Sequence, residues 1–121
     1  IPPEGYVLQP NILYLGHTNE LTYTNCYAPF IEGRSSIGRM GISVHITAGF
    51  GDIGFNGTWT LEITAVHPVR VYADVEICQI AFHTVVGNAM VRYAGKYNNQ
   101  TGPRPSGIWK EFKNGRYAPR T

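Results

Sequence analysis

The chain has 121 residues, of which 43% are hydrophobic and 15% are charged, and its formal net charge is +2. This length suits one domain with its own core, and for so small a domain we expect association into an oligomer to add stability. The chain has no run of about 18 apolar residues, which argues against a transmembrane helix, and its first ten residues lack the pattern of a signal peptide, so we expect a soluble, cytoplasmic protein.

Short strands separated by turns are predicted along most of the chain. In residues 41–47 the apolar Ile42, Val44 and Ile46 alternate with polar residues, which is typical of a strand with one buried face. Residues 59–66 alternate in the same way and place Glu62 on the polar face. Because Gly and Pro punctuate the gaps and no long helical periodicity is present, the pattern predicts an all-β sandwich, jelly roll or barrel. In chain order, the predicted strands are residues 6–9, 12–15, 20–24, 28–32, 41–47, 59–66, 69–72 and 76–84.

The stretch from residue 32 to residue 62 concentrates the polar chemistry of the chain among seven glycines. Arg34 and Arg39 offer charged donors, and Ser35 and Ser36 offer hydroxyls. These groups are suited to phosphate or carboxylate. A carboxylate follows on the strand that contains Glu62, so this stretch is the first candidate for a polar site.

The basic residues gather at the C-terminal end. Residues 1–91 hold three Lys or Arg and seven acidic residues, whereas residues 92–121 hold seven Lys or Arg and one acid, Glu111. This tail predicts an anionic partner, with a solvated, frayed terminus as the alternative. Nucleic acid is a weaker interpretation, because no RNA-binding signature of interleaved aromatic and basic residues is present.

Four segments together carry a resemblance to a known family. They read EGRSSIGR, VHITAGFGDIGFNGTWTLEI, VRVYADVEICQIAF and KYNNQTGPRPSGIWKEF. In this order and spacing the chain closely resembles the deoxycytidine triphosphate (dCTP) deaminases of the dUTPase-like superfamily, over residues 2–112. The resemblance implies a distorted jelly roll or β-barrel of short strands, assembled as a homotrimer with sites between subunits. It also implies that residues 1–121 form one domain without the family's N-terminal segment, and that residues 92–121 close the site.

The resemblance further implies the zinc-independent hydrolysis of dCTP to dUTP and ammonia. Glu62 matches the family's general base and acid, which activates a water and passes protons to the ring and to the leaving amine. Ser35 and the backbone of Thr47 and Ala48 would position that water. Arg39 would form an ion pair with Glu62 and tune its protonation.

The remaining ligands follow the family motif position by position. By this resemblance, Asp52 contacts the sugar 3′-hydroxyl, Phe55 packs on the sugar or base, and Thr60 lines the base pocket. Asp52 could instead be an ordinary turn aspartate. Mg²⁺ would arrive bound to the triphosphate. The implied triphosphate ligands are Arg34, Ser36, Tyr93, Lys96 and Gln100.

Zinc chemistry, used by other nucleobase deaminases, is not predicted. Those enzymes need an H-x-E segment and a P-C-x-x-C segment, and no pair of potential ligands here has zinc spacing. The histidines are expected to be ordinary surface or strand residues, with His45 beside the site as the one to test. The residues concerned are His17, His45, His67, His83, Cys26 and Cys78.

Four alternatives to a plain dCTP deaminase stay open at the level of sequence. The TAGF segment, residues 47–50, resembles bifunctional members that continue from dUTP to dUMP and diphosphate. The chain could instead be a dUTP diphosphatase without deaminase activity, or a catalytically silent regulator that binds dCTP or dTTP. The remaining interpretation is a structural jelly roll, in which the charges of the RSSxGR block (residues 34–39) are solvated. Inhibition by dTTP is left undecided.

Overall fold

The computed structural model describes residues 1–87 and 92–118. Within these ranges the chain is mostly β-strand, with one short α-helix and one 3-10 helix, so the predicted all-β class is confirmed. The elements are β1 (Tyr6–Leu8), β2 (Tyr14–Tyr23), β3 (Tyr27–Gly33), α1 (Ser35–Gly38), β4 (Ile42–Ser43), β5 (Asn56–Ala65), β6 (Val69–Val71), β7 (Cys78–Thr84), the 3-10 helix η1 (Ile108–Glu111), β8 (Phe112–Lys113) and β9 (Arg116–Tyr117).

Strand β5 is the centre of an antiparallel sheet with the order β2-β5-β4. Opposite residues include Leu15 and Glu62 across β2 and β5. Two strands were predicted where β2 forms one, because the register shifts between His17 and Leu21 without ending the strand. At this irregularity the side chain of Thr18 accepts a hydrogen bond from the backbone N–H of Trp59, at 2.9 Å, and so keeps the two strands joined.

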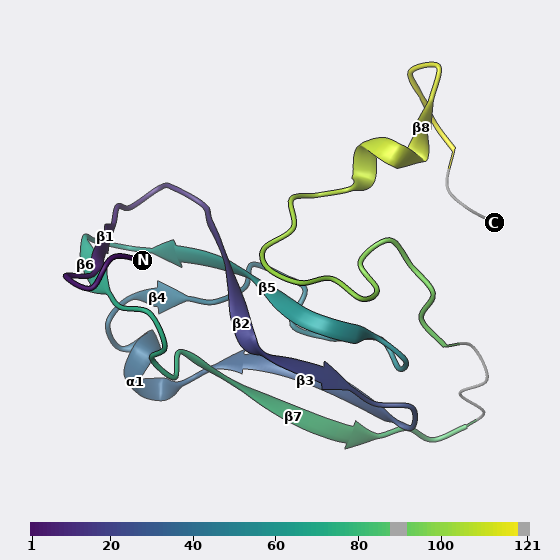
Figure 1. Ribbon diagram of the computed structural model, residues 1–121, viewed down its shortest axis with the longest axis horizontal. Helices are drawn as coiled ribbons and strands as arrows, with labels where there is room; N and C mark the ends of the chain where they lie inside the picture. Colours follow the sequence, from purple (N-terminus) through teal and green to yellow (C-terminus); the bar gives the residue numbers. More distant parts are fainter. Residues whose placement is uncertain (88–91, 119–121) are drawn as a thin grey trace.

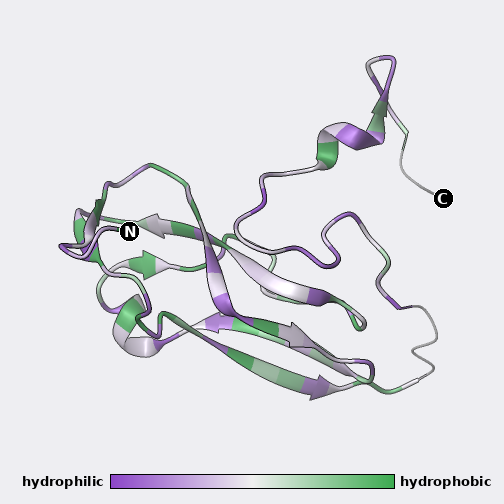
Figure 2. Cartoon of the chain, in the orientation of Figure 1, coloured by the Kyte–Doolittle hydropathy of each residue, from purple (hydrophilic) through white to green (hydrophobic). Residues whose placement is uncertain are grey.

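Strands β3 and β7 form a second antiparallel pair, and β1 and β6 form a third. Figure 1 shows β3 and β7 side by side along one side of the molecule, with β5 and β4 on the other side. Figure 2 shows hydrophobic and hydrophilic residues mixed along these strands. Neighbouring side chains of a strand point to opposite faces of the sheet, so one strand can send only some of its side chains to the core. The buried apolar residues come from β1, β3, α1, β4 and β5, with Val44 just after β4: Leu8, Ala28, Pro29, Ile31, Ile37, Ile42, Val44, Leu61 and Ala65.

The strand predicted over residues 41–47 is shorter than expected, since β4 ends at Ser43. Ile42 and Val44 are buried as the alternation predicts, but Ile46 is 58% exposed, which corrects the expectation that it faces the core. The reason is local. The backbone N–H of Ile46 donates to the side chain of Glu62 at 3.0 Å instead of to a neighbouring strand.

Residues 49–51 and 93–100 are tied to the rest of the fold by backbone hydrogen bonds. Gly49 accepts from Ile31 at 2.7 Å, and Gln100 accepts from Thr58 at 3.0 Å. Beyond Gln100 the chain leaves the sheets, and η1, β8 and β9 form an arm that projects from the body (Figure 1). None of the helices within the described ranges has the length and apolar content of a membrane-spanning segment.

Candidate active site

A cavity of about 390 Å³ opens beside the central strand β5, between β2, residues 48–55 and the segment that begins at Tyr93. Its size falls within the range of small-molecule sites, which are concave and mostly apolar with a few polar groups. More than half of the residues predicted from sequence line it. They are Ala48, Asp52, Phe55, Thr60, Glu62, Tyr93 and Gln100.

Glu62 is held in place by the turn that follows β4. Its backbone N–H donates to Val44 at 3.0 Å, while its carboxylate oxygen Oε2 accepts from the backbone N–H of Ile46, also at 3.0 Å. One oxygen of the carboxylate is therefore oriented by the main chain. The side chain is half-buried and lines the cavity, so a water or ligand in the cavity can reach a carboxylate whose position is fixed. This is the geometry that a general base requires.

Asp52 lies in a tight turn between residues 51 and 55. The N–H of Phe55 donates to Asp52 at 3.2 Å, and the N–H of Gly54 donates to Thr24 at 2.8 Å. Gly54 has a φ of +91°, a conformation that favours glycine. The N–H of Tyr93 donates to Ile53 from the other side, at 2.8 Å. The turn is thus clamped on two sides, and the exposed Asp52 carboxylate lies at the cavity.

Three aromatic rings form one wall of the cavity. The Phe55 ring lies 5.3 Å from the Trp59 ring and 6.0 Å from the Tyr93 ring, measured between centroids. Trp59 is fixed by a 2.8 Å hydrogen bond from its indole N–H to Thr22. Rings held in this way offer a rigid apolar surface to a flat or puckered ligand ring.

Gln100 connects the tail to the cavity and is buried. Its side-chain amide N–H donates to the backbone carbonyl of Thr58 at 2.7 Å and to the Thr60 hydroxyl at 3.4 Å. The Thr60 hydroxyl also accepts from the backbone N–H of Arg104 at 3.1 Å. The amide oxygen of Gln100 is buried without a hydrogen-bond partner among the described residues. It is an acceptor available to a donor on a ligand or water.

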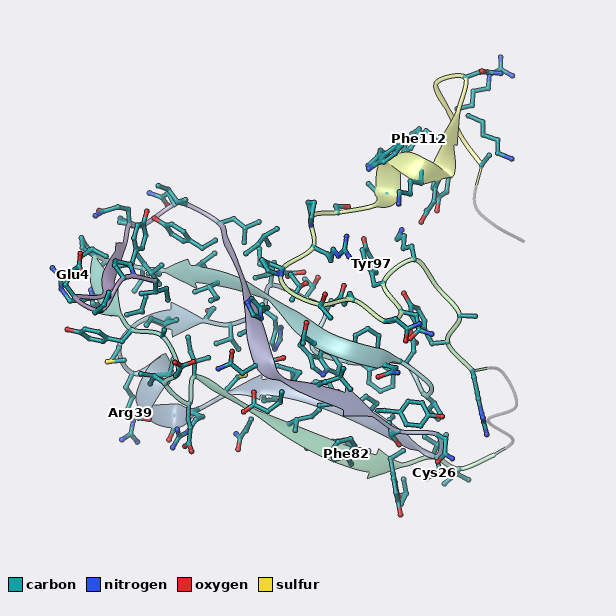
Figure 3. All side chains as sticks on the ribbon, viewed as in Figure 1. Glu4, Cys26, Arg39, Phe82, Tyr97 and Phe112 are labelled. Carbon is teal, nitrogen blue, oxygen red and sulfur yellow. The ribbon has the colours of Figure 1, made fainter. Side chains whose placement is uncertain are left out.

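The residues of the RSSxGR block lie away from this cavity. Arg34 precedes α1, Ser35 and Ser36 begin it, and Arg39 follows it. Ser35, Ser36 and Arg39 are exposed, whereas Ile37 is buried and anchors the helix. Figure 3 shows Arg39 far from Tyr97, which lines the cavity.

The ion pair expected between Arg39 and Glu62 is therefore absent within this chain, and the backbone of Ile46 takes its place at the carboxylate. Of the two residues expected to supply backbone for the water, Ala48 lines the cavity, whereas the exposed Thr47 does not.

Arg34 and Lys96, the two predicted phosphate-binding cations, are both paired with carboxylates. Nη1 of Arg34 donates to the Glu76 carboxylate and to the Glu76 backbone carbonyl, each at 2.8 Å. Lys96 pairs with Glu111 of η1. The hydrogen bond that Lys96 donates to the Glu111 carboxylate is the main cause that raises the pKa of Lys96 above its usual value. Lys96 lines a second hollow of about 310 Å³, which shares Gln100 and Arg104 with the first cavity.

Sequence reasoning missed several residues that line the main cavity. Tyr97 lies within the KYNNQ segment and Arg104 within GPRPSG, so their places in the quoted motifs were the available signal. Leu13, Leu15 and Phe50 carried no signal beyond being apolar. The missed lining residues are Leu13, Leu15, Phe50, Gly51, Trp59, Tyr97, Arg104 and Ser106.

The potential metal ligands of the chain do not gather. Among the described residues, no three side chains of the types His, Cys, Asp and Glu are placed to hold one metal ion. His45, singled out from its position in the sequence, is half-buried, and its Nδ1 is buried without a hydrogen-bond partner.

Comparison with known proteins places this site in context. Residues 1–85 match a family model described as dCTP deaminase-like. The chain is 55% identical over 113 residues to a "dCTP deaminase, dUMP-forming" of Clostridium botulinum, covering 93% of the chain and 65% of that protein. It is 56% identical over 114 residues to a protein of the same name from Clostridium acetobutylicum, covering 94% of the chain and 66% of that protein. A protein of that name from Leptospira biflexa is 56% identical over 113 residues, with coverages of 93% and 65%. The chain thus spans about 65% of the length of these relatives.

Proposed function

Because the chain belongs to the dCTP deaminase-like family, we propose that it acts in the hydrolytic deamination of dCTP and in the further conversion of the resulting dUTP to dUMP and diphosphate. The observation that carries this proposal is Glu62. Its carboxylate is fixed by the main chain and half-buried, and it lines a cavity large enough for a nucleoside. The names of the relatives, dUMP-forming deaminases, favour the two-step reaction.

In the first step, Glu62 takes a proton from a water in the cavity as the water oxygen attacks C4 of the cytosine ring. The proton passes to the ring nitrogen N3. A second proton, again through Glu62, reaches the amino group, which leaves as ammonia and restores a neutral pyrimidine with oxygen at C4. The single carboxylate of Glu62 is enough for both proton transfers, because they occur one after the other at neighbouring atoms. Positioned proton transfer contributes about 10²- to 10⁴-fold, and orientation and electrostatics supply the remainder.

The cavity residues divide between base, sugar and phosphate. We assign Thr60 and Ala48 to the base and the bound water, and Phe55 and Asp52 to the sugar. Tyr93 and Gln100 of the cavity, together with Lys96 of the adjoining hollow, are assigned to the triphosphate. Asp52 suits a sugar hydroxyl, because it is an exposed carboxylate in a clamped turn. Gln100 would reach a phosphate oxygen only through its side-chain amide N–H, which here donates to Thr58 and Thr60, because its unpartnered oxygen can only accept.

The donor set suits Mg²⁺ held by the nucleotide. The carboxylates lining the cavity are Asp52 and Glu62, and both have other assigned partners. Mg²⁺ commonly keeps several waters and binds through substrate phosphates. The ion would shield phosphate charge for the diphosphate-releasing step, while the chain itself supplies Arg34 and Lys96.

We further propose that the active protein is a cytoplasmic homotrimer with a dUTPase-like jelly roll. Arg34, Ser35, Ser36 and Arg39 lie outside the cavity of their own chain, and an adjacent subunit is the natural recipient of these side chains. Exposed apolar side chains such as Leu21 (60%) and Tyr23 (55%) of β2 support association of chains. Residues 1–121 would act as one domain, with residues 92–121 closing the site.

One assay tests the function. The protein is incubated with dCTP and Mg²⁺, and the products are separated and identified. We expect ammonia, dUMP and diphosphate. Accumulation of dUTP would limit the activity to deamination, hydrolysis of added dUTP alone would identify a plain diphosphatase, and binding of dCTP or dTTP without turnover would identify a regulator.

A further inference from the structure

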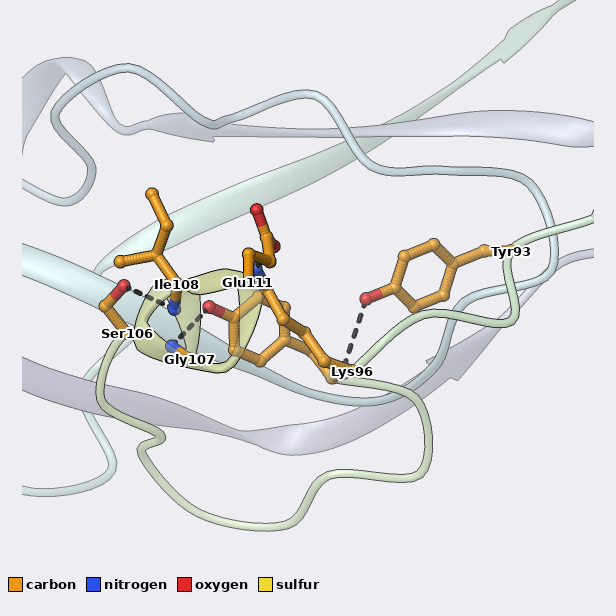
Figure 4. A network of polar contacts seen from close by, with 7 residues as sticks. Tyr93, Lys96, Ser106, Gly107, Ile108 and Glu111 are labelled. Atoms are coloured by element: carbon orange, nitrogen blue, oxygen red, sulfur yellow. Dashed lines mark hydrogen bonds and ion pairs between the residues drawn. The ribbon is translucent and has the colours of Figure 1, made fainter. Parts of the chain in front are cut away.

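Lys96, which lines the hollow next to the main cavity, forms an ion pair with Glu111. The side chains of Lys96 and Glu111 are only 22% and 20% exposed. A pair so removed from solvent is costly to break unless another partner replaces the lost one. Figure 4 shows the carboxylate of Glu111 close to Lys96 within a network of polar contacts.

The segment that carries Glu111 is anchored to the cavity wall. The N–H of Gly107, just before η1, donates to the Tyr97 hydroxyl at 2.9 Å. The N–H of Tyr97 in turn donates to the Tyr93 hydroxyl at 3.1 Å, and Tyr93 lines the main cavity. After η1, the N–H of Ala118 donates to the carbonyl of Glu111 at 2.7 Å. The hydrogen bonds at Gly107 and Ala118 therefore hold the segment on both sides of Glu111 and fix the position of Glu111 beside Lys96.

Glu111 and a triphosphate would compete for the same cation. An ammonium has three donors, but a carboxylate and a polyanion gathered on one ammonium repel each other at close range. Glu111 is also the one acid among the basic residues of positions 92–121. Its position on Lys96 thus fills the place that a phosphate group is expected to take.

We propose that Glu111 is an internal anion that occupies Lys96 until the triphosphate of the nucleotide displaces it, so that Glu111 sets the affinity for the nucleotide. The inference rests on the proposed function, in which Lys96 is a phosphate ligand. Lys96 is charged at neutral pH, since its hydrogen bond to Glu111 raises its pKa further above the usual value. Exchange of one anion for another keeps the cation paired throughout.

The size of the effect follows from the fraction of molecules in which Lys96 is available. Apparent affinity is reduced by that fraction, so a pair formed in about nine of ten molecules weakens binding about tenfold. Glu111→Gln removes the charge and keeps the shape of the side chain. We expect it to tighten binding by about three- to tenfold.

The experiment measures the dissociation constants of dCTP and of inorganic tripolyphosphate by calorimetry, in an E62Q background that prevents turnover. E62Q/E111Q is compared with E62Q, and Glu4→Gln at the far end of the molecule serves as the control for a lost surface charge (Figure 3). The same comparison on a Lys96→Ala background should show no effect of Glu111→Gln, because the ammonium for which Glu111 and the phosphate compete is then absent. Thermal unfolding of each variant checks that the fold is kept.

Tighter binding that requires Lys96 supports the proposal. Unchanged or weaker binding by E62Q/E111Q overturns it, and weaker binding would make Glu111 a residue that aims Lys96 instead. A gain that persists with Lys96→Ala, or no binding of either probe, also overturns it. Turnover of dCTP by the unsubstituted chain is measured separately. Its absence together with tighter tripolyphosphate binding would refute the proposed function while keeping the exchange at Lys96.

Discussion

The cavity beside β5 and the corner formed by α1 hold the predicted site residues in opposite ways. At β5, Glu62 and Thr60 are half-buried and face residues contributed by β2, by the 48–55 segment and by the tail. At α1, Ser35, Ser36 and Arg39 are exposed, and Ile37 alone points into the core. One chain thus completes the environment of the carboxylate but leaves the RSSxGR side chains without a site of their own. At α1 the buried Ile37 fixes the helix while its polar neighbours Ser35, Ser36 and Arg39 face outward. A surface that contacts another subunit needs this arrangement.

The largest effect is expected for Glu62→Gln. The glutamine oxygen can still accept the hydrogen bond from Ile46, but it cannot carry a proton. We expect the turnover of dCTP to fall by about 10²- to 10⁴-fold, with the affinity for dCTP changed less than about threefold. Steady-state release of ammonia and calorimetric titration measure the two quantities, with Glu4→Gln as the matched control. Turnover near that of the parent would remove Glu62 from the chemistry.

The next prediction tests whether the two regions belong to one site across subunits. Glu62→Gln and Arg34→Ala are each expected to be inactive, and they are coexpressed with different tags so that mixed oligomers form. If each site takes α1 from one subunit and Glu62 from another, roughly one site in four receives both intact halves, so about a quarter of the parent activity returns.

Oligomers that contain only Glu62→Gln or only Arg34→Ala provide the control for this recovery of activity. Mixed oligomers that are isolated with both tags and remain inactive would contradict an intersubunit site. The RSSxGR side chains would then need another explanation within their own chain.

The sequence predicts the strand that carries Glu62 well, because the pattern is local. Alternation in residues 59–65 places Leu61 and Ala65 in the core and Glu62 on the other face, as observed, although Trp59 and Ile63 of the apolar set are only half-buried. The same rule fails at Ile46, where a backbone N–H bonds to a side chain instead of to a strand. The periodicity of one segment carries no information about this contact, because Ile46 and Glu62 meet only after β4 has turned.

The pairing of the cations was not predictable for the same reason. Glu111 is plainly the one acid of the tail in the sequence, but its contact with Lys96 depends on where η1 begins and on the Tyr97 hydroxyl that anchors Gly107. Likewise, Arg34 meets Glu76 only through the pairing of β3 with β7, which sets Gly33 opposite Cys78. Spacing along the chain identifies the cations, whereas the tertiary fold selects their partners.

A moderate effect is expected for Thr60→Val on the β5 side. The substitution removes the hydroxyl that accepts from Arg104 and Gln100. The cost is that of an ordinary hydrogen bond, about 0.5–1.5 kcal/mol, because Arg104 is exposed and the Gln100 amide keeps its bond to Thr58. We expect kcat/KM for dCTP to fall by about tenfold. Thr64→Val is the matched control, since Thr64 is half-buried on the same strand and does not line the cavity. Equal effects of the two substitutions would show a general loss of stability instead of a contact in the base pocket.

The smallest effect is expected for Glu76→Gln on the α1 side. The Glu76 side chain is 84% exposed and that of Arg34 is 41% exposed, and exposed ion pairs contribute only about 0–1 kcal/mol because water and salt screen them. The backbone carbonyl of Glu76 still accepts from Arg34 after the substitution. We therefore expect KM for dCTP to change less than about fivefold at low salt, and the change to vanish in 0.5 M NaCl, an ionic strength at which the screening length is about 4 Å.

Arg34→Lys is the contrasting variant, because lysine keeps the charge but loses the planar fork that can hold Glu76 and a phosphate at once. Its KM should rise more than that of Glu76→Gln, and the rise should persist in salt. A tenfold or greater loss for Glu76→Gln would mean that its carboxylate is needed to aim Arg34. The α1 corner would then be organised by its own chain before any partner arrives, as the β5 cavity already is.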